Sequence, residues 1–468
     1  MKKILSVIAV LIIGSVGYFV LFTQKNYNVI IFAFDGLQAN HLKAYGYEKN
    51  TTPNLDAFLN TAYTFRNTVS PASWTVPSFM SIFTSLYPSE HKVVNKFVEY
   101  ATVGTSTKAV RANLKELSPS AVTLAELFKK NGYATAGFTG DAGVSAAFGH
   151  AQGFDEYYDK ESFGGLASSI PKAEDWLSKN KDKKFFLFIH GYDVHGQYAP
   201  NEGFDYRYVT QPYKGKYTGS TKEQGALREL SLATPGLSTL SEEDKEFWRA
   251  IYDEKISRAD ARFGEFMKYV DELGIGKKTI IAVISDHGTE FFEHNGIDHG
   301  HTLYGELVNT LFAIHAPNQS KGVEIKNLVS TLDLAPTLLK MTDIKDATIN
   351  VMKGIDLTPS FSGADVSHDV YSETDYRLYT HKRSVTTTDG WKFIITMDTG
   401  VKELYNLNND PREQNNLIAS EEQKAHELEQ KVYTHLKAIR ADKGPWTIGC
   451  SPVYADQCGA LSSSTKKK

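Results

Sequence analysis

The fold of this chain is decided by a short apolar stretch near its N-terminus, Asn28-Val29-Ile30-Ile31-Phe32-Ala33-Phe34-Asp35. Consecutive apolar side chains over this length predict a strand that is buried on both faces of a sheet. The stretch ends in a carboxylate, and a charge at the end of a buried strand costs free energy unless it is paired or binds a cation. Asp35 is therefore either a structural cap of the next turn or a ligand.

Two later stretches repeat this pattern, because residues 184–190 and 278–286 are apolar runs that end at His190 and Asp286. Helical segments alternate with the strands. Alternation of this kind predicts an α/β fold whose ligands bind beyond the carboxyl ends of the strands. The expected helices cover residues 52–60, 77–86, 123–131, 243–273 and 333–339. The polar, glycine-containing segment 206–235 predicts an insertion or flap over the site.

The pattern changes near Gly363, where short strand signals appear at 370–373, 391–395 and 403–407, followed by a charged helix at 421–439. These signals predict a small antiparallel sheet with one helix. We therefore divide the chain into an N-terminal segment 1–27, a main α/β domain 28–362, a C-terminal α+β subdomain 363–442 and a tail 443–468.

Composition excludes one class of partner. The 468 residues carry 51 Lys and Arg against 55 Asp and Glu, for a net charge of −4. The chain has no broad basic stripe, so a nucleic-acid partner is not expected.

The N-terminus indicates where the protein works. Met1-Lys2-Lys3 is a basic head, and Ile4 to Phe22 is almost wholly apolar. At 1.5 Å per residue this span measures about 28 Å, close to the thickness of the bilayer hydrocarbon. The leading lysines predict a cytoplasmic start and an exported remainder, anchored in the inner membrane and facing the periplasm or the cell exterior. A cleaved signal peptide and a secreted product is the alternative.

The two cysteines of the chain, Cys450 and Cys458, lie close together near its end. In an oxidising compartment they can close a short disulfide loop. Two free thiols are the alternative.

The third apolar run leads into Ser285-Asp286-His287-Gly288. Together with Asp35, this motif predicts a metal site with carboxylate oxygens and one imidazole nitrogen. Calcium prefers oxygen ligands, whereas imidazole suits zinc, manganese and similar ions. We therefore expect one divalent metal, with Mn, Zn or Mg favoured over Ca.

A further segment, Ser73-Trp74-Thr75-Val76-Pro77-Ser78-Phe79, resembles, with Asp35 and Asp286-His287, the sulfatase-like branch of the alkaline phosphatase superfamily. The family's sulfatases place a cysteine or serine, oxidised to formylglycine, in a C/S-x-P-S-R segment that opens a helix. The resemblance puts Thr75 at the nucleophile position, and Thr75 would also contact the metal. Threonine is not a substrate of that oxidation, so no formylglycine is expected. Phe79 replaces the arginine of the motif.

The resemblance also implies roles for four histidines. His190-Gly191-Tyr192-Asp193-Val194-His195 is similar to the family's D-x-H segment, which makes His195 the candidate general acid. His190 is either a substrate contact or a structural residue at the strand end. In Asp298-His299-Gly300-His301, His299 is favoured over His301 as the group that binds the anion.

These observations predict an exported, metal-dependent hydrolase of phosphate or sulfate esters that uses Thr75, with phosphoesters slightly preferred. Threonine favours phosphorus because a phosphothreonine can be hydrolysed at phosphorus. The expected substrate is a small molecule or an envelope polymer. The alternatives are an arylsulfatase-like sulfuric ester hydrolase, an envelope phosphoglycerol or phosphoethanolamine transferase, and a catalytically silent binding protein.

Overall fold

A computed structural model describes residues 27–94, 99–103, 106–110, 117–196, 198, 204–233, 240–376 and 380–442. Its centre is an eight-stranded sheet in the order β12-β2-β11-β8-β1-β7-β5-β6. Neighbouring strands are parallel except at β11, which runs antiparallel to both β8 and β2. The strands are β1 (Asn28–Phe34), β2 (Tyr63–Val69), β5 (Ala134–Phe138), β6 (Glu156–Tyr158), β7 (Phe185–Gly191), β8 (Thr279–Ser285), β11 (Phe312–His315) and β12 (Val323–Ser330). The mostly parallel α/β sheet is the predicted fold.

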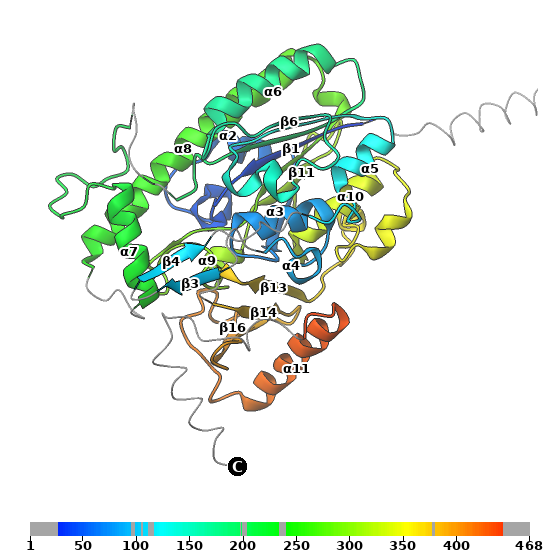
Figure 1. The fold of residues 1–468 in the computed structure, drawn as a ribbon. Coiled ribbons are helices and arrows are strands. Elements are labelled where there is room, and N and C mark those ends of the chain that lie inside the picture. Colours follow the sequence, from blue (N-terminus) through cyan, green and yellow to red (C-terminus); the bar gives the residue numbers. More distant parts are fainter. Residues whose placement is uncertain are drawn as a thin grey trace, which may run out of the picture.

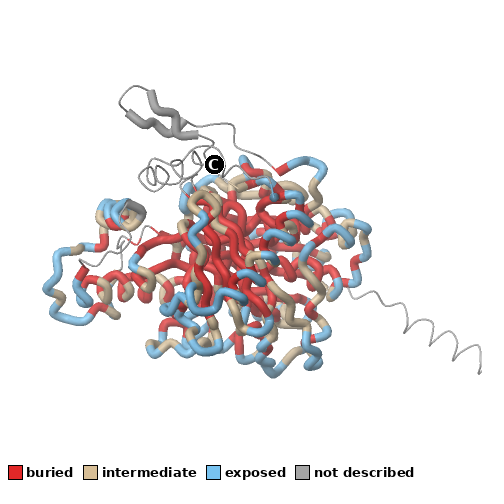
Figure 2. The backbone as a smooth tube through the Cα atoms, turned by 90° about the horizontal axis from the view of Figure 1, so that it is seen from below, coloured by how far each residue is buried: buried red, intermediate tan, exposed pale blue. Residues whose placement is uncertain are grey.

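Helices cover both faces of this sheet (Figure 1). Alternate residues of β1 enter two separate cores, which is why the strand is apolar throughout: Ile30 and Phe32 face one core, and Val29 and Ile31 face the other. The first core is closed by α6 (Leu166–Asn180), α8 (Glu242–Glu272) and α2 (Pro53–Leu59), and the second by α3 (Thr75–Thr84), α5 (Leu124–Lys130) and α10 (Leu334–Met341). Buried residues fill the sheet between these layers (Figure 2).

A second, four-stranded antiparallel sheet follows, in the order β13-β14-β15-β16. Its strands are β13 (Val370–Thr374), β14 (Lys382–Thr386), β15 (Trp391–Thr396) and β16 (Lys402–Asn406), and helix α11 (Glu422–Ala438) packs on it. Ile394 and Tyr405 pack against Leu303 and Leu307 of the main body. The predicted C-terminal sheet with one helix is thus present.

The remaining elements lie outside the two main sheets and the helices that cover them. They are α4 (Pro88–His91), α7 (Thr221–Ala233), α9 (Gly305–Val308), β3 (Glu99–Val103), β4 (Ser106–Val110), β9 (Glu290–Phe291), β10 (Ile297–Asp298) and 3-10 turns at Ala39–His41, Lys43–Tyr45, Ala142–Val144, Ala146–Phe148, Gly276–Lys278, Thr331–Asp333, Ala347–Val351 and Thr358–Ser362. Helix α7 lies within the segment 206–235 that was expected to be an insertion or flap over the site. Helix α3 begins at Thr75, two residues before the expected start at Pro77.

Two predictions fall on residues outside those described. They are the apolar segment 4–22 and the disulfide between Cys450 and Cys458. Among the described residues, none of the helices is both long and apolar enough to span a bilayer.

Candidate active site

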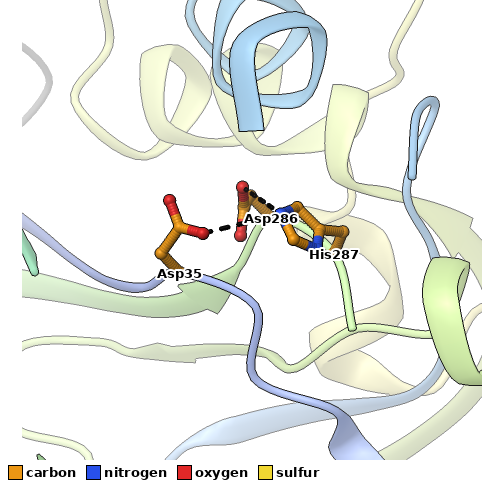
Figure 3. Close-up of side chains that lie close together, drawn as sticks. All are labelled: Asp35, Asp286 and His287. Atoms are coloured by element: carbon orange, nitrogen blue, oxygen red, sulfur yellow. Dashed lines mark ion pairs between the residues drawn. The ribbon is translucent and has the colours of Figure 1, made fainter. Parts of the chain in front are cut away.

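Three ligand groups converge where β1 and β8 end side by side. Asp35 follows β1 and Asp286-His287 follows β8, and the two strands pair in parallel so that Phe34 lies beside Ser285. One ligand atom from each residue lies within 4.8 Å of the others, and all three side chains are fully buried. His287 Nε2 is 3.5 Å from Asp35 Oδ1 and 3.4 Å from Asp286 Oδ2. Figure 3 shows the three groups turned toward one another.

The outward-facing polar atom of each of these residues is held by a hydrogen bond, which leaves the inward atom for a metal. The bonds run from His190 Nε2–H to Asp35 Oδ2 (2.9 Å), from Gly36 N–H to Asp286 Oδ1 (3.1 Å) and from His287 Nδ1–H to Gly288 O (2.7 Å). Asp286 Oδ2 is buried and accepts no hydrogen bond from the described residues. Metal ligands are typically oriented by such outer partners, so the residues present fit one divalent cation.

The electrostatics of the group also favour a cation. Burial, with Asp35 beside it, raises the pKa of Asp286 to about 8. Burial lowers the pKa of His287, but the Asp286 and Asp35 carboxylates outweigh burial and raise it to about 9. Without a metal the three groups therefore hold extra protons to balance charge, and a divalent ion would replace those protons.

Thr75 lies against this group as the first residue of α3. Its Oγ1 is 3.3 Å from Asp35 Oδ1 and 3.3 Å from His287 Nε2, and the residue is 3 % exposed. The side chain of Trp74, which precedes the helix, accepts no hydrogen bond from the first N–H groups of α3. A helix start of this kind favours an anion.

Two of the predicted histidines border the same space. The His299 ring stacks on the His287 ring at 4.5 Å between centroids, and the His195 ring is 4.6 Å from His299. His195 Nδ1–H donates to Gly196 O, so Nε2 faces inward, 3.9 Å from Asp35 Oδ1. Burial lowers the pKa of His195 to about 3, and burial also lowers the pKa of His299. Both rings are therefore neutral at pH 7 in the ligand-free site.

The other two predicted histidines face protein groups instead. His190 is fully buried; its Nδ1 accepts the Gly140 N–H at 3.5 Å, so its Nε2–H donates to Asp35. Both ring nitrogens of His190 therefore contact protein groups, which favours the structural alternative over a substrate contact. His301 Nε2 pairs with Glu290 Oε2 at 2.8 Å. This pairing occupies the nitrogen that an anion would need, which supports the preference for His299.

Two further residues, Tyr192 and Gly143, shape the site, although no sequence pattern singled them out. The Tyr192 ring packs edge-on against both His190 (4.7 Å) and His195 (4.9 Å), and its hydroxyl accepts the Gly143 N–H at 2.7 Å. Tyr192 thus fixes two histidines and brings the backbone at Gly143 toward Thr75.

Helix α7 supports the other side of the site. Asp298 Oδ1 is 2.6 Å from His299 Nδ1, and Asp298 Oδ2 is 3.3 Å from both Gln224 and Arg228 of α7. Burial raises the pKa of Asp298, but His299 and Arg228 outweigh burial and hold it below its ordinary range. The ionised carboxylate therefore orients the His299 ring, and α7 orients the carboxylate.

Gly143 has to be glycine for Thr75 to keep its place. A Cβ at this position would lie 2.7 Å from Thr75 Cγ2 and 2.8 Å from Thr75 Cβ. We expect Gly143→Ala to lower kcat by about 10- to 100-fold, because displacing a reacting group by 1 Å has effects of that size. Steady-state kinetics measure it. Gly225→Ala is the control, since Gly225 lies in α7 with open space around it. Full activity of Gly143→Ala would mean that Thr75 does not have to stay in place.

Comparison with known protein families identifies the family to which this chain belongs. Residues 27–344, more than half of the chain, match the family described as Sulfatase. The chain belongs to the sulfatase family. It is therefore a hydrolase of the alkaline phosphatase superfamily, and residues 293–442 match the family described as N-sulphoglucosamine sulphohydrolase, C-terminal. Sulfatase-family enzymes hold a metal ion at this site, and the group of Asp35, Asp286 and His287 is its candidate holder in this sulfatase-family chain.

Individual relatives agree with this assignment. The sulfatase-family chain is 25% identical over 432 residues to a protein named Sulfatase of Formosa agariphila, covering 82% of each chain. It is 23% identical over 425 residues to a Delta 4,5-hexuronate-2-O-sulfatase of Bacteroides thetaiotaomicron, covering 84% of this chain and 85% of the relative. A structure solved with its substrate D-glucosamine-2-N,6-O-disulfate has the same fold, with a TM-score of 0.70, 19% identity, and coverage of 90% of this chain and 100% of the other.

Proposed function

We propose that this chain hydrolyses sulfate esters of carbohydrates, with Thr75 as the nucleophile. The observation that carries the proposal is the position of Thr75 Oγ1, 3.3 Å from ligand atoms of both Asp35 and His287. The substrate class is supported by the names of the relatives, among which are sulfatases of sugar derivatives. The relatives favour sulfate over the phosphoester that Thr75 alone suggested.

A divalent cation held by Asp35, Asp286 and His287 would stabilise a hydroxyl in its ionised form and polarise the ester. Calcium is the metal of the family's site. The imidazole ligand of this chain keeps zinc in the test, and its two carboxylates keep manganese and magnesium.

The side chains of the site supply the proton transfers. Thr75 Oγ1–H donates to Asp35 Oδ1, which is also 3.9 Å from His195 Nε2. The neutral His195 ring can accept the proton that Thr75 loses. Thr75 Oγ1 then bonds to sulfur, the bond between sulfur and the alcohol oxygen breaks, and His195 returns the proton to the departing alcohol.

Release of the sulfuryl group requires a second displacement. A threonine ester cannot expel sulfate from an aldehyde hydrate, so water has to attack sulfur, breaking the Thr75 Oγ1–S bond and returning a proton to Thr75. Because this second step has no assistance from an aldehyde, we expect it to be the slower one. Alcohol release should then show a burst that matches the enzyme concentration.

Phosphate ester hydrolysis is the second candidate, and Thr75 is the observation that favours it. A phosphothreonine is released by attack at phosphorus, which the same geometry allows. The two functions share a nucleophile and a metal group, so only the substrate separates them.

Matched substrates test the proposal. Full-length protein, stripped of metal and reloaded with Mn, Zn, Mg or Ca, is offered sulfated glucosamine, an aryl sulfate, an aryl phosphate and an aryl phosphodiester. We expect the highest kcat/KM on a sulfate ester. Turnover of the phosphoesters alone would replace the proposal by the second candidate.

We also propose that the chain works outside the cytoplasm, held by the apolar segment 4–22. Fractionation of cells that express the tagged full chain tests this. Recovery in the cytosolic fraction would exclude it.

A further inference from the structure

Lysines flank the start of β1 on both sides. The strand lies between β7 and β8, and both neighbours run parallel to it. The turns that lead into these neighbours are Lys181-Asp182-Lys183-Lys184 and Gly276-Lys277-Lys278. Their ends meet β1 at Asn28, which pairs with Thr279 and accepts the Phe185 N–H through its side chain at 3.3 Å. We call this part of the surface the lysine edge, defined by Lys181, Lys183, Lys184, Lys277 and Lys278.

The charge of the lysine edge is not balanced by the protein. No ion pair within the described residues includes any of its five lysines. Lys183 Nζ donates to Asn180 Oδ1 at 2.8 Å, and Lys184 Nζ lies 4.4 Å from the centroid of the Tyr133 ring. The other three lysines are exposed. These ammonium groups are therefore available to an anionic partner.

Few acidic groups face these lysines. They are Asp182 within the first turn and Asp271 and Glu272 at the end of α8. Glu272 already pairs with Lys268 at 3.6 Å. Two unpaired carboxylates thus stand against five lysines, so the edge is positive although the whole chain carries a net charge of −4.

The segment proposed as the membrane anchor enters the fold at this edge. Only residues 23–26 separate the apolar segment 4–22 from Tyr27, whose carbonyl accepts the Tyr133 hydroxyl at 3.1 Å. A chain advances at most about 3.6 Å per residue, so Asn28 lies within about 20 Å of the end of the apolar segment. Lipid headgroups occupy about 6 Å of that distance. A bilayer that holds segment 4–22 is therefore close to the lysine edge.

The candidate active site lies at the other end of β1. The strand has seven residues, about 23 Å at the rise of a β-strand, and Asp35 follows its far end. Helix α5 leads to the lysine edge, where Ala134 N–H donates to Lys184 O at 2.9 Å. Helix α7, which supports His299, lies on the opposite side of the molecule from α5 (Figure 1). Contact between the lysine edge and a bilayer would turn the site away from that bilayer.

We propose that the lysine edge rests on anionic phospholipid headgroups, so that the bilayer orients the active site toward substrate in the aqueous phase. The inference rests on the proposed anchoring by segment 4–22. Each lysine near an anionic bilayer strengthens binding by about fivefold. Headgroup phosphates are the anions that the anchor brings to these lysines. Dissolved carbohydrate sulfates can then reach the site, whereas headgroups of the same bilayer cannot.

Lysine labelling in vesicles tests the orientation. The full-length chain is reconstituted in vesicles of phosphatidylcholine alone or mixed with phosphatidylglycerol, acetylated with a water-soluble reagent, and analysed by peptide mass spectrometry. We expect Lys181, Lys183 and Lys277 to react at least about threefold more slowly in the anionic vesicles, because headgroups cover them. High salt should remove this protection, since it screens the attraction.

The matched control is a pair of lysines at the far end of the same long helix. Helix α8 spans 31 residues, about 45 Å, and Lys214 N–H donates to Glu243 Oε1 near its start. Lys214 and Lys216 are exposed and should react equally fast in both vesicles.

Two charge-reversal variants complete the test. Lys277→Glu combined with Lys278→Glu should abolish the protection of Lys181 and Lys183. Lys214→Glu combined with Lys216→Glu should leave that protection unchanged. All four side chains are exposed, so both variants should melt close to the temperature of the unmodified chain.

The outcomes separate this inference from the anchoring on which it rests. Equal labelling of the lysine edge in both vesicles, or equal protection of Lys214 and Lys216, overturns the inference. Protection by a sulfated polysaccharide but not by phosphatidylglycerol would assign the edge to the polymer and also overturn it. Failure of the chain to sediment with neutral vesicles would overturn the anchoring, and labelling in the presence of anionic vesicles would still decide whether the lysine edge binds them.

Discussion

Thr75→Val is expected to lower kcat on the preferred sulfate ester by at least about 10³-fold, as the removal of a nucleophile does in other hydrolases. Valine has nearly the shape of threonine, so the change removes the hydroxyl and little else. The hydroxyl is 3.3 Å from Asp35 Oδ1 and from His287 Nε2, where no other hydroxyl is seen to contact either atom among the described residues. Steady-state and burst kinetics measure the loss.

The control is Thr75→Ser, which keeps a hydroxyl on the first residue of α3. We expect it to retain activity within about tenfold of the unmodified chain and to keep the burst. Binding should survive in both variants, because the N–H groups at the start of α3 and the histidines remain. The stability lost with the Thr75 hydrogen bonds is about 1 kcal/mol, so thermal melts separate misfolding from lost chemistry.

Activity of Thr75→Val close to that of the unmodified chain would remove Thr75 from the mechanism. Mass spectrometry of enzyme quenched during turnover provides an independent check. It should find one sulfuryl group on the peptide that contains Thr75, and a sulfuryl group on another residue would contradict the assignment.

The framework of the site could be predicted from the sequence because it depends on local patterns. A run such as 28–35 predicts a buried strand, and parallel strands place their carboxyl ends at one edge of the sheet. Asp35 and Asp286-His287 were therefore expected to meet, as they do. Thr75 was expected at a helix start, and it is the first residue of α3.

What the sequence did not predict depends on contacts between distant segments. Tyr192 and Gly143 lie outside the main strands and helices, and their roles follow from where their segments meet. The polar segment 206–235 was expected to be an insertion or flap, but nothing in its composition indicated that a helix, α7, would form there and reach Asp298 through Gln224 and Arg228. Periodicity does not reveal such a partner, because tertiary contacts stabilise most helices.

The choice between sulfate and phosphate esters is a second point that the sequence does not predict. Thr75 favours phosphorus on chemical grounds, whereas the relatives favour sulfate. Both substrates are tetrahedral anionic esters that would use the same metal group and the same helix start. The pattern of residues therefore identifies the reaction class, and the atom attacked depends on details of charge and release that no motif encodes.

Asp286→Asn should abolish most of the activity and raise the Kd of the metal by at least about 100-fold. Asparagine has the shape of aspartate and can still accept the Gly36 N–H through its oxygen, but it loses the charge at the inward atom. Calorimetric titration of metal into stripped protein measures affinity directly. In the unmodified chain, metal binding should raise the melting temperature, because a ligand that binds only the folded state stabilises it.

Without metal the effect of this substitution on stability should change sign. The ordinary pKa of Asp286 is 3.8, and burial with Asp35 beside it raises that pKa to about 8 in the folded chain. The folded state then holds a proton that the unfolded state releases, so stability falls as pH rises from about 4 to about 8. Asp286→Asn cannot ionise. The stripped variant should therefore be at least as stable as the stripped unmodified chain, by a margin that grows across this pH range.

Asp260→Asn is the matched control, because Asp260 is another buried carboxylate, 1 % exposed, that accepts hydrogen bonds from the start of α2. It should leave the metal affinity unchanged. The difference in stability between this variant and the unmodified chain should be the same with and without metal. For Asp286→Asn, we expect the order of the melting temperatures to depend on metal. The unmodified chain should have the higher melting temperature when loaded, and the variant should melt at the same or a higher temperature when both are stripped, at several pH values. If metal changed the stability of Asp286→Asn no more than that of Asp260→Asn, Asp286 would be an ordinary buried acid and not a metal ligand, since only a ligand has its charge balanced by the ion.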